Sequence, residues 1–153
     1  MSDEPSAPYL ASAVFYQDPK AALLWLEEAF GFETSMVIVD QSGELAHSQM
    51  RFGQSLVMIG MEWSERHRSA RSMGGVNTQT VHVQLASDLD AHCEPARKAG
   101  AMILQEPETQ FYGDRTYRAE DPEGHIWTFA QTVEEMNPAE WEKTMGLTLR
   151  TRL

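Results

Sequence analysis

Residues 18–31 read DPKAALLWLEEAFG and contain the signals that begin and end a helix. Asp18 suits the N-cap, and Pro19 suits the first helical position, where its missing N–H costs nothing. Gly31 can adopt the left-handed conformation that closes a helix. The stretch therefore predicts a helix with one apolar face that packs against a sheet, formed by Ala22, Leu26, Ala29 and Phe30.

Strand-like segments surround this helix. One β-prone run precedes it, and three more follow it with turn-prone breaks between them, at spacings typical of a meander. These segments are residues 10–16, 33–40, 44–52 and 54–61.

The same order of elements returns about 70 positions later. Three pairs of residues share this offset, at 70, 69 and 71 positions: Asp18 and Asp88, Gly31 and Gly100, Gly53 and Gly124. The second set predicts a strand, a helix and three strands at 79–86, 88–100, 102–106, 115–120 and 125–131. Such a repeat predicts β-α-β-β-β twice. The alternative is coincidence among common turn residues.

The pattern divides the chain into five segments of one domain. They are a flexible N-terminus (1–8), a first module (9–61), a linker or mobile loop (62–78), a second module (79–131) and a C-terminal extension with a short helix (132–153). Pro95 lies inside the second predicted helix, where we expect it to kink or restart that helix.

Composition narrows the functional classes. The chain of 153 residues has 12 Lys and Arg against 23 Asp and Glu, a net charge of −11. Such a surface gains nothing from the phosphates of nucleic acid or from an anionic membrane, whereas a cationic ligand would be attracted. The charge can equally serve solubility alone. Cys93 is the only cysteine, which excludes an internal disulfide and a cysteine-rich zinc site.

No part of the sequence predicts a membrane or export segment. No run approaches the roughly 20 apolar residues that a membrane-spanning helix needs. The first residues, MSDEP, are acidic and lack the basic and apolar regions of a secretory signal. We therefore expect a cytoplasmic protein.

The repeat, residues 18–32 and the closing stretch DPEGHIW at 121–127 together resemble the vicinal oxygen chelate superfamily over residues 9–131. This superfamily includes glyoxalase I, bleomycin-resistance proteins and extradiol dioxygenases. The resemblance implies an α+β fold of two β-α-β-β-β modules, whose eight strands form a curled sheet around a cleft with the helices outside. It also implies a homodimer.

The resemblance also implies four metal-ligand positions in metal-using members. They fall on Ala11, on Ile59 or Gly60, on His82 and on Thr128. Only His82 has a side chain that binds zinc, nickel or iron well, because alkyl groups cannot coordinate and a Thr hydroxyl is a poor ligand. Shifting the alignment by a residue does not help, and Glu62 is the nearest carboxylate to the second position. We therefore expect no metal and no cofactor.

Several polar and apolar residues remain candidates for the cleft. His82 alternates with the apolar side of its strand and is a candidate general base or ligand contact, together with Gln84. The alternative is a histidine bonded only to a neighbouring strand. His47 is a second candidate, with a solvated strand face as its alternative. Phe15 and Met58 are candidate apolar walls, and Thr128 occupies a ligand position.

The strand at 115–120 has two alternating sets of side chains. Arg115 and Tyr117 lie on one side and Arg118 on the other, and an Arg in the cleft would hold a carboxylate or phenolate. The sequence leaves open which set faces the cleft, and an exposed edge strand is an equal alternative. Cys93 and Trp127 are expected to face the core.

Three functions fit these observations. The first is a metal-free protein that sequesters an aromatic or cationic small molecule, as bleomycin-resistance proteins do. The second is a lyase- or isomerase-type enzyme that uses His82 as its base or a metal site misplaced in the alignment. The third is a dimeric accessory domain without a ligand.

Overall fold

The computed structural model describes residues 10–153, so the expected flexible N-terminus at 1–8 lies outside the described residues. The first module contains β1 (Ser12–Tyr16), α1 (Pro19–Phe30), β2 (Glu33–Val39), β3 (Leu45–Phe52) and β4 (Ser55–Met61). The second contains β5 (Val81–Gln84), α2 (Leu89–Lys98), β6 (Met102–Thr109), β7 (Asp114–Glu120) and β8 (Ile126–Thr132). A last helix, α3 (Pro138–Met145), follows.

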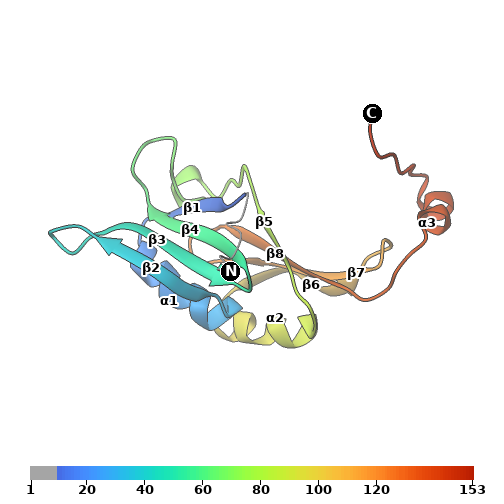
Figure 1. Cartoon of the computed structure of the whole chain (residues 1–153), viewed down its shortest axis with the longest axis horizontal. Coiled ribbons are helices and arrows are strands. Elements are labelled where there is room, and N and C mark those ends of the chain that lie inside the picture. Colours follow the sequence, from blue (N-terminus) through green and yellow to red (C-terminus); the bar gives the residue numbers. More distant parts are fainter. Residues whose placement is uncertain (1–9) are drawn as a thin grey trace, which may run out of the picture.

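Both modules have the same topology. The strand orders are β1-β4-β3-β2 and β5-β8-β7-β6, and in each module the first strand pairs parallel to the last while the others are antiparallel. The predicted α+β fold and its two β-α-β-β-β units are confirmed. The eight strands form two separate four-stranded sheets, however, and the sheets do not close into a barrel (Figure 1).

The helices lie against one side of the sheets and pack side by side (Figure 1). Asp18 caps α1 by accepting from the Ala21 amide at 3.1 Å, and Gly31 ends the helix at φ 73°, as the sequence predicted. The Trp25 indole donates to the Ala99 carbonyl at 2.8 Å, and Phe30 contacts Trp127 and Phe129 of the second module. The two modules therefore share one apolar core.

Of the kink or restart that the sequence predicts at Pro95, the restart does not occur. The helix runs from Leu89 to Lys98 with Pro95 inside it. Pro95 has no N–H to donate to the carbonyl of Ala91, four residues earlier. Both residues lie on the exposed face of the helix. Water can therefore solvate the freed carbonyl, which keeps the cost of the proline low.

The turn between β7 and β8 joins the two modules. The Asp121 carboxylate accepts from the Tyr16 hydroxyl at 2.6 Å and from the Trp127 indole at 3.1 Å. The Glu123 carboxylate accepts from the Gln17 and Asp18 amides, at 2.6 and 3.1 Å, just before α1. A negative charge is thus held at the positive end of α1, across the boundary between the modules.

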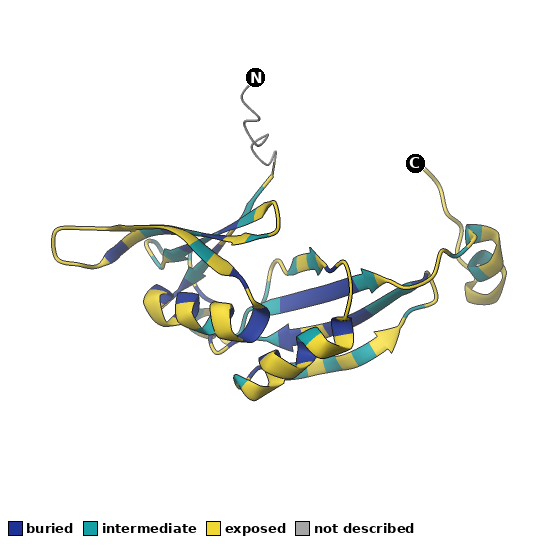
Figure 2. Cartoon of the chain, turned by 60° about the horizontal axis from the view of Figure 1, so that its bottom comes forward, coloured by how far each residue is buried: buried dark blue, intermediate teal, exposed yellow. Residues whose placement is uncertain are grey.

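The linker at 62–78 is folded against the body. It contains an isolated bridge between Ser64 and His67 and a short 3₁₀ turn at Arg71–Met73, and the Arg71 amide donates to the Glu123 carbonyl at 2.8 Å. Beyond β8 the chain leaves the body, and α3 lies at one end of the molecule (Figure 2). Within residues 10–153, none of the helices is long and apolar enough to cross a bilayer.

Candidate functional site

Each sheet has one face on the helices and one face turned away, which we call the open face. In the first module Val14, Ile59 and Met50 are buried towards the helices. The alternate residues form the open face of that sheet: Ala13, Phe15, His47, Gln49, Leu56, Met58 and Gly60. Phe15 and Met58, the candidate apolar walls, therefore both lie on this open face.

Gly60 leaves room for the Phe15 ring beside it on this face. The two residues are partners in the β1–β4 register, and a Cβ at Gly60 would meet the Phe15 ring at 3.3 Å. Ile59 is fully buried on the helix side. Of the two residues considered for the second metal-ligand position, Gly60 is therefore the one on the open face.

The open face of the second sheet is polar. His82 of β5 is the register partner of Thr128 of β8, which in turn pairs with Arg118 of β7. Since neighbouring residues in register point to the same side, these three side chains form one row across the sheet. His82 and Arg118 are exposed, and Gln84 lies beside the row, where its amide donates to Thr132 at 3.2 Å.

Arg115 and Tyr117 lie on the opposite side of β7 and do not reach this row. Arg115 makes a two-pronged ion pair with Asp90 of α2, with both N···O distances 2.8 Å. Tyr117 is fully buried, and its hydroxyl lies 2.6 Å from His92 Nδ1. Of the two alternating sets of side chains on this strand, the one containing Arg118 is on the open face.

His92 of α2 is a half-buried residue that packs against the core, and the sequence predicted no role for it. Its Nε2 lies 2.8 Å from the Phe30 carbonyl, so a neutral ring can donate there while Nδ1 accepts from the Tyr117 hydroxyl. Burial lowers the pKa of His92 and raises the pKa of Tyr117. His92 therefore bridges the two helices and β7. No local sequence pattern indicated this role, because the two partners of His92 are 25 and 62 residues away in the chain.

The residues at the four metal-ligand positions do not fit a metal ion. Ala11 and Gly60 have no coordinating atom, the Phe15 ring covers Gly60, and Thr128 offers only a hydroxyl beside His82. In the part of the chain that the structure describes, no group of three or more His, Cys, Asp and Glu side chains could hold a metal. No chemical step is therefore assigned to a metal here.

Aromatic side chains extend the open face of the first sheet into the 62–78 linker. The His67 ring stacks on Trp63, with centroids 4.0 Å apart, and meets the Phe15 ring edge-on at 5.2 Å. The Ser64 hydroxyl lies 2.7 Å from His67 Nδ1 and forms a hydrogen bond that holds the His67 ring. Trp63 is 65% exposed, so one large aromatic surface is available to a ligand. No motif or periodicity in the sequence points to His67.

Two hollows adjoin these residues. One of about 480 Å³ lies between β1, the linker and the start of β8, and Phe15 lines it. The other, of about 710 Å³, lies between β5 and the first module, and His82 and Gln84 line it. Both volumes are large enough for a small organic molecule.

The comparisons with known proteins agree with this architecture. Residues 9–129 match the model of the Glyoxalase/Bleomycin resistance protein/Dioxygenase superfamily. The chain belongs to this superfamily. The match covers both modules and the turn at 121–124 but ends before α3.

Relatives within and around the superfamily cover most of the chain. An uncharacterized protein of Mycobacterium bovis is 28% identical over 143 residues, which are 91% of this chain and 93% of the relative. The crystal structure of TioX from Micromonospora sp. ML1 has a TM-score of 0.64 at 27% identity, covering 82% of this chain and 99% of TioX. TnmS3, an antibiotic binding protein from Streptomyces sp. CB03234, has a TM-score of 0.62 at 16% identity, covering 80% and 93%. At that identity TnmS3 shows the shared fold.

Proposed function

We propose that this chain is a small-molecule binding protein that uses no metal and holds an aromatic compound against its open faces without altering it. The observation that carries the proposal is the set of side chains at the superfamily's metal-ligand positions. Ala11, Gly60 and Thr128 cannot anchor a metal ion with His82, while Phe15 covers Gly60 with an aromatic surface. TnmS3, an antibiotic binding protein that shares the fold, supports a binding role.

The lining favours an aromatic ligand over a cationic one. Phe15, Trp63 and Met58 offer flat and adaptable apolar surface, which suits planar rings. Arg118 lies on the polar open face of the second sheet. The negative net charge of the chain would attract a cation from a distance, but Arg118 would repel that cation at contact distance. An aromatic compound with a carboxylate or phenolate therefore fits best.

A homodimer is part of the proposal. The apolar and polar open faces belong to different sheets, and each keeps exposed side chains, among them Ala13 on the first and His82 and Arg118 on the second. If the first sheet of one copy faces the second sheet of another, Phe15 and Met58 stand opposite His82 and Arg118. The symmetric pair then has two equivalent clefts.

The test is calorimetry of the full chain against planar aromatic compounds with an acidic group, a neutral group or a cationic group. We expect saturable binding without product formation, strongest for the acidic compounds. Arg118→Ala should weaken their binding by about tenfold, the loss of one charged hydrogen bond. Arg115→Ala is the matched control, because Arg115 lies on the same strand but pairs with Asp90 on the other side.

Two results would overturn the proposal. One is stoichiometric retention of zinc, nickel or manganese after dialysis. The other is product formation that His82→Ala abolishes while ligand affinity stays within a few-fold, which would make the protein an enzyme with His82 as its base.

A further inference from the structure

The C-terminal arm (residues 133–153) is a folded segment with almost no cover from its own chain. Its helix α3 is capped at both ends: the Asn137 side chain accepts from the Ala139 amide at 3.1 Å, and Gly146 closes the helix at φ 66°. None of the α3 residues is buried. Helices this short are marginal in water without tertiary packing, so α3 needs a surface to pack on.

The root of the arm is firmly held. The Val133 and Glu134 amides both donate to the Gly113 carbonyl, at 3.0 and 3.1 Å, and the Trp141 ring meets Phe111 at 5.6 Å. A Cβ at Gly113 would collide with the Glu134 carbonyl oxygen. The turn before β7 therefore fixes where the arm leaves the body, whereas its apolar side chains stay exposed: Met145, Leu147, Leu149 and Leu153.

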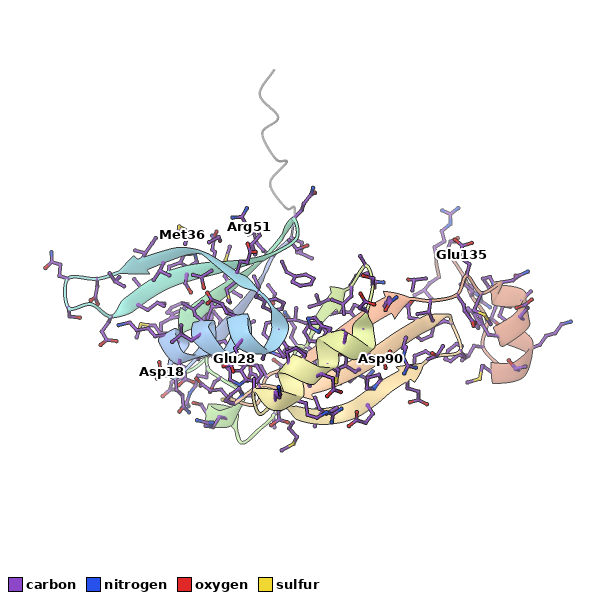
Figure 3. All side chains as sticks on the ribbon, turned by 90° about the horizontal axis from the view of Figure 1, so that it is seen from below. Asp18, Glu28, Met36, Arg51, Asp90 and Glu135 are labelled. Atoms are coloured by element: carbon purple, nitrogen blue, oxygen red, sulfur yellow. The ribbon has the colours of Figure 1, made fainter. Side chains whose placement is uncertain are left out.

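An uncovered apolar surface lies at the opposite end of the molecule. Met36, Val37, Ile38 and Val39 of β2 are 37, 47, 48 and 52% exposed. Because consecutive strand residues point to opposite sides, neither face of this half of β2 is covered. β2 is also an edge strand, and an exposed apolar edge promotes association. Figure 3 shows Met36 and Glu135, at the arm root, at opposite ends of the molecule.

The end of the arm and the β2–β3 hairpin carry opposite charges. From Lys143 to Leu153 the arm contains three basic side chains and no acidic one, in a chain whose net charge is −11. The β2–β3 hairpin carries Glu33, Asp40 and Glu44 around its exposed apolar run, with Arg51 as its one Lys or Arg. Residues 133–142 of the arm hold four glutamates, so it is the end of the arm, residues 143–153, that is complementary to the hairpin in both polarity and charge.

We infer that the arm of one copy packs on the β2–β3 hairpin of a second copy, and that the two copies exchange arms symmetrically. This inference rests on the proposed dimer, in which the first sheet of one chain faces the second sheet of the other. In each elongated chain the hairpin and the arm lie at opposite ends (Figure 1). A symmetric pairing that runs the two chains in opposite directions brings the arm end of each to the hairpin end of its partner. Each arm then closes one end of a cleft.

Cysteine cross-linking of the full chain tests the exchange. The native Cys93 is fully buried, and burial raises the pKa of its thiol to about 11, so it stays unreactive. Ile38→Cys and Leu149→Cys are made separately, mixed, and treated with a short bifunctional maleimide. We expect a covalent dimer from the mixture and at least tenfold less from either variant alone. Leu104→Cys mixed with Leu149→Cys is the control, because Leu104 is similarly exposed at 44% on the edge strand β6.

The outcomes separate this inference from the proposed function. Cross-linked monomer in a chain carrying both cysteines, without dimer in the mixture, would mean that the arm folds onto its own hairpin and would overturn the exchange. A dimer by light scattering that binds ligand but does not cross-link above the Leu104 control would also overturn it, while leaving the proposed function intact. Cross-linking by a dimer that binds none of the aromatic compounds would support the exchange and count against the proposed function.

Discussion

Tyr117 and His92 illustrate how single residues of this chain acquire their roles. Tyr117 belongs to a polar strand, yet its ring is fully buried because the aromatic body fills the core while its hydroxyl reaches His92. His92 in turn reaches the last carbonyl of α1, at Phe30. Tyr117, a cleft candidate in the sequence, is thus part of the core, and His92, for which the sequence predicted no role, packs against that core.

The His92 bridge predicts a pH-dependent stability. Burial lowers the pKa of His92 below its usual 6.5, so the ring stays neutral in the folded chain while it takes up a proton near pH 6.5 once unfolded. The contribution of His92 to the free energy of unfolding is therefore complete above pH 6.5. It is lost as the pH falls towards the pKa that His92 has in the folded chain. We therefore expect the His92→Gln substitution to lower the melting temperature more at pH 7.5 than at pH 5.5. The loss at pH 7.5 should be greater by about 2–4 °C.

Differential scanning calorimetry at both pH values checks this expectation. His82→Gln is the control, because the His82 side chain is exposed on an open face and should leave both melting temperatures unchanged. A His92→Gln difference that does not change with pH would contradict the assigned neutral bridge.

Among the elements, α1 depends on the other module for its start. Asp18 supplies the local cap, which the sequence predicted, but Glu123 of the β7–β8 turn accepts the two amides just before the helix. Asp121 of the same turn binds Tyr16 at the end of β1. The stretch that suggested the superfamily therefore ties the modules together as well as shaping a turn.

Removing the Glu123 carboxylate should loosen the beginning of α1. We expect Glu123→Ala to lower the free energy of unfolding by about 1–3 kcal/mol, because two charged hydrogen bonds to backbone amides are lost in a buried position. Hydrogen exchange of the Gln17 and Asp18 amides should accelerate. Glu120→Ala, on the open side of β7, is the control and should change neither quantity measurably.

As a whole molecule, the chain has one core spread over both modules. Phe30 of α1 packs on Trp127 and Phe129 of β8, and Trp25 bonds to the residue that ends α2. The exposed side chains of the open faces, such as His82 and Arg118, are left outside this core.

The shared core predicts that both modules unfold in one transition. Leu26→Ala in α1 and Leu89→Ala in α2 each remove a fully buried side chain, at a cost of about 2–5 kcal/mol. Each substitution should lower the urea concentration at the midpoint of unfolding. The unfolding curves followed by far-UV circular dichroism and by tryptophan fluorescence should still coincide. Two separate transitions in either variant would show independent modules.

The repeat made most of the fold predictable. Helix signals at 18–31 and turns at similar positions in both halves placed every strand to within a few residues, because caps and turns depend on local backbone chemistry. Whether Pro95 restarts α2 was not predictable, because the cost of the proline depends on whether the freed carbonyl meets water. The two separate sheets also departed from the expected single curled sheet.

The candidate site was less predictable. The alternation of strand 115–120 gave two sets of side chains, but only the packing of α2 on β7 decided that Arg115 and Tyr117 face inwards and Arg118 outwards. His67 and Trp63 joined Phe15 through a folded linker that has no periodic pattern.

By itself the sequence determined the duplicated modules, their caps and turns, and the loss of ligand chemistry at three of the four metal-ligand positions, since these depend on residue type and local spacing. The tertiary structure alone decided which strand face is open, that His92 and Glu123 bridge distant segments, and that the arm and β2 lie exposed at opposite ends. Such relations join residues far apart in the chain, and only the packing of one shared core brings them together or leaves them uncovered.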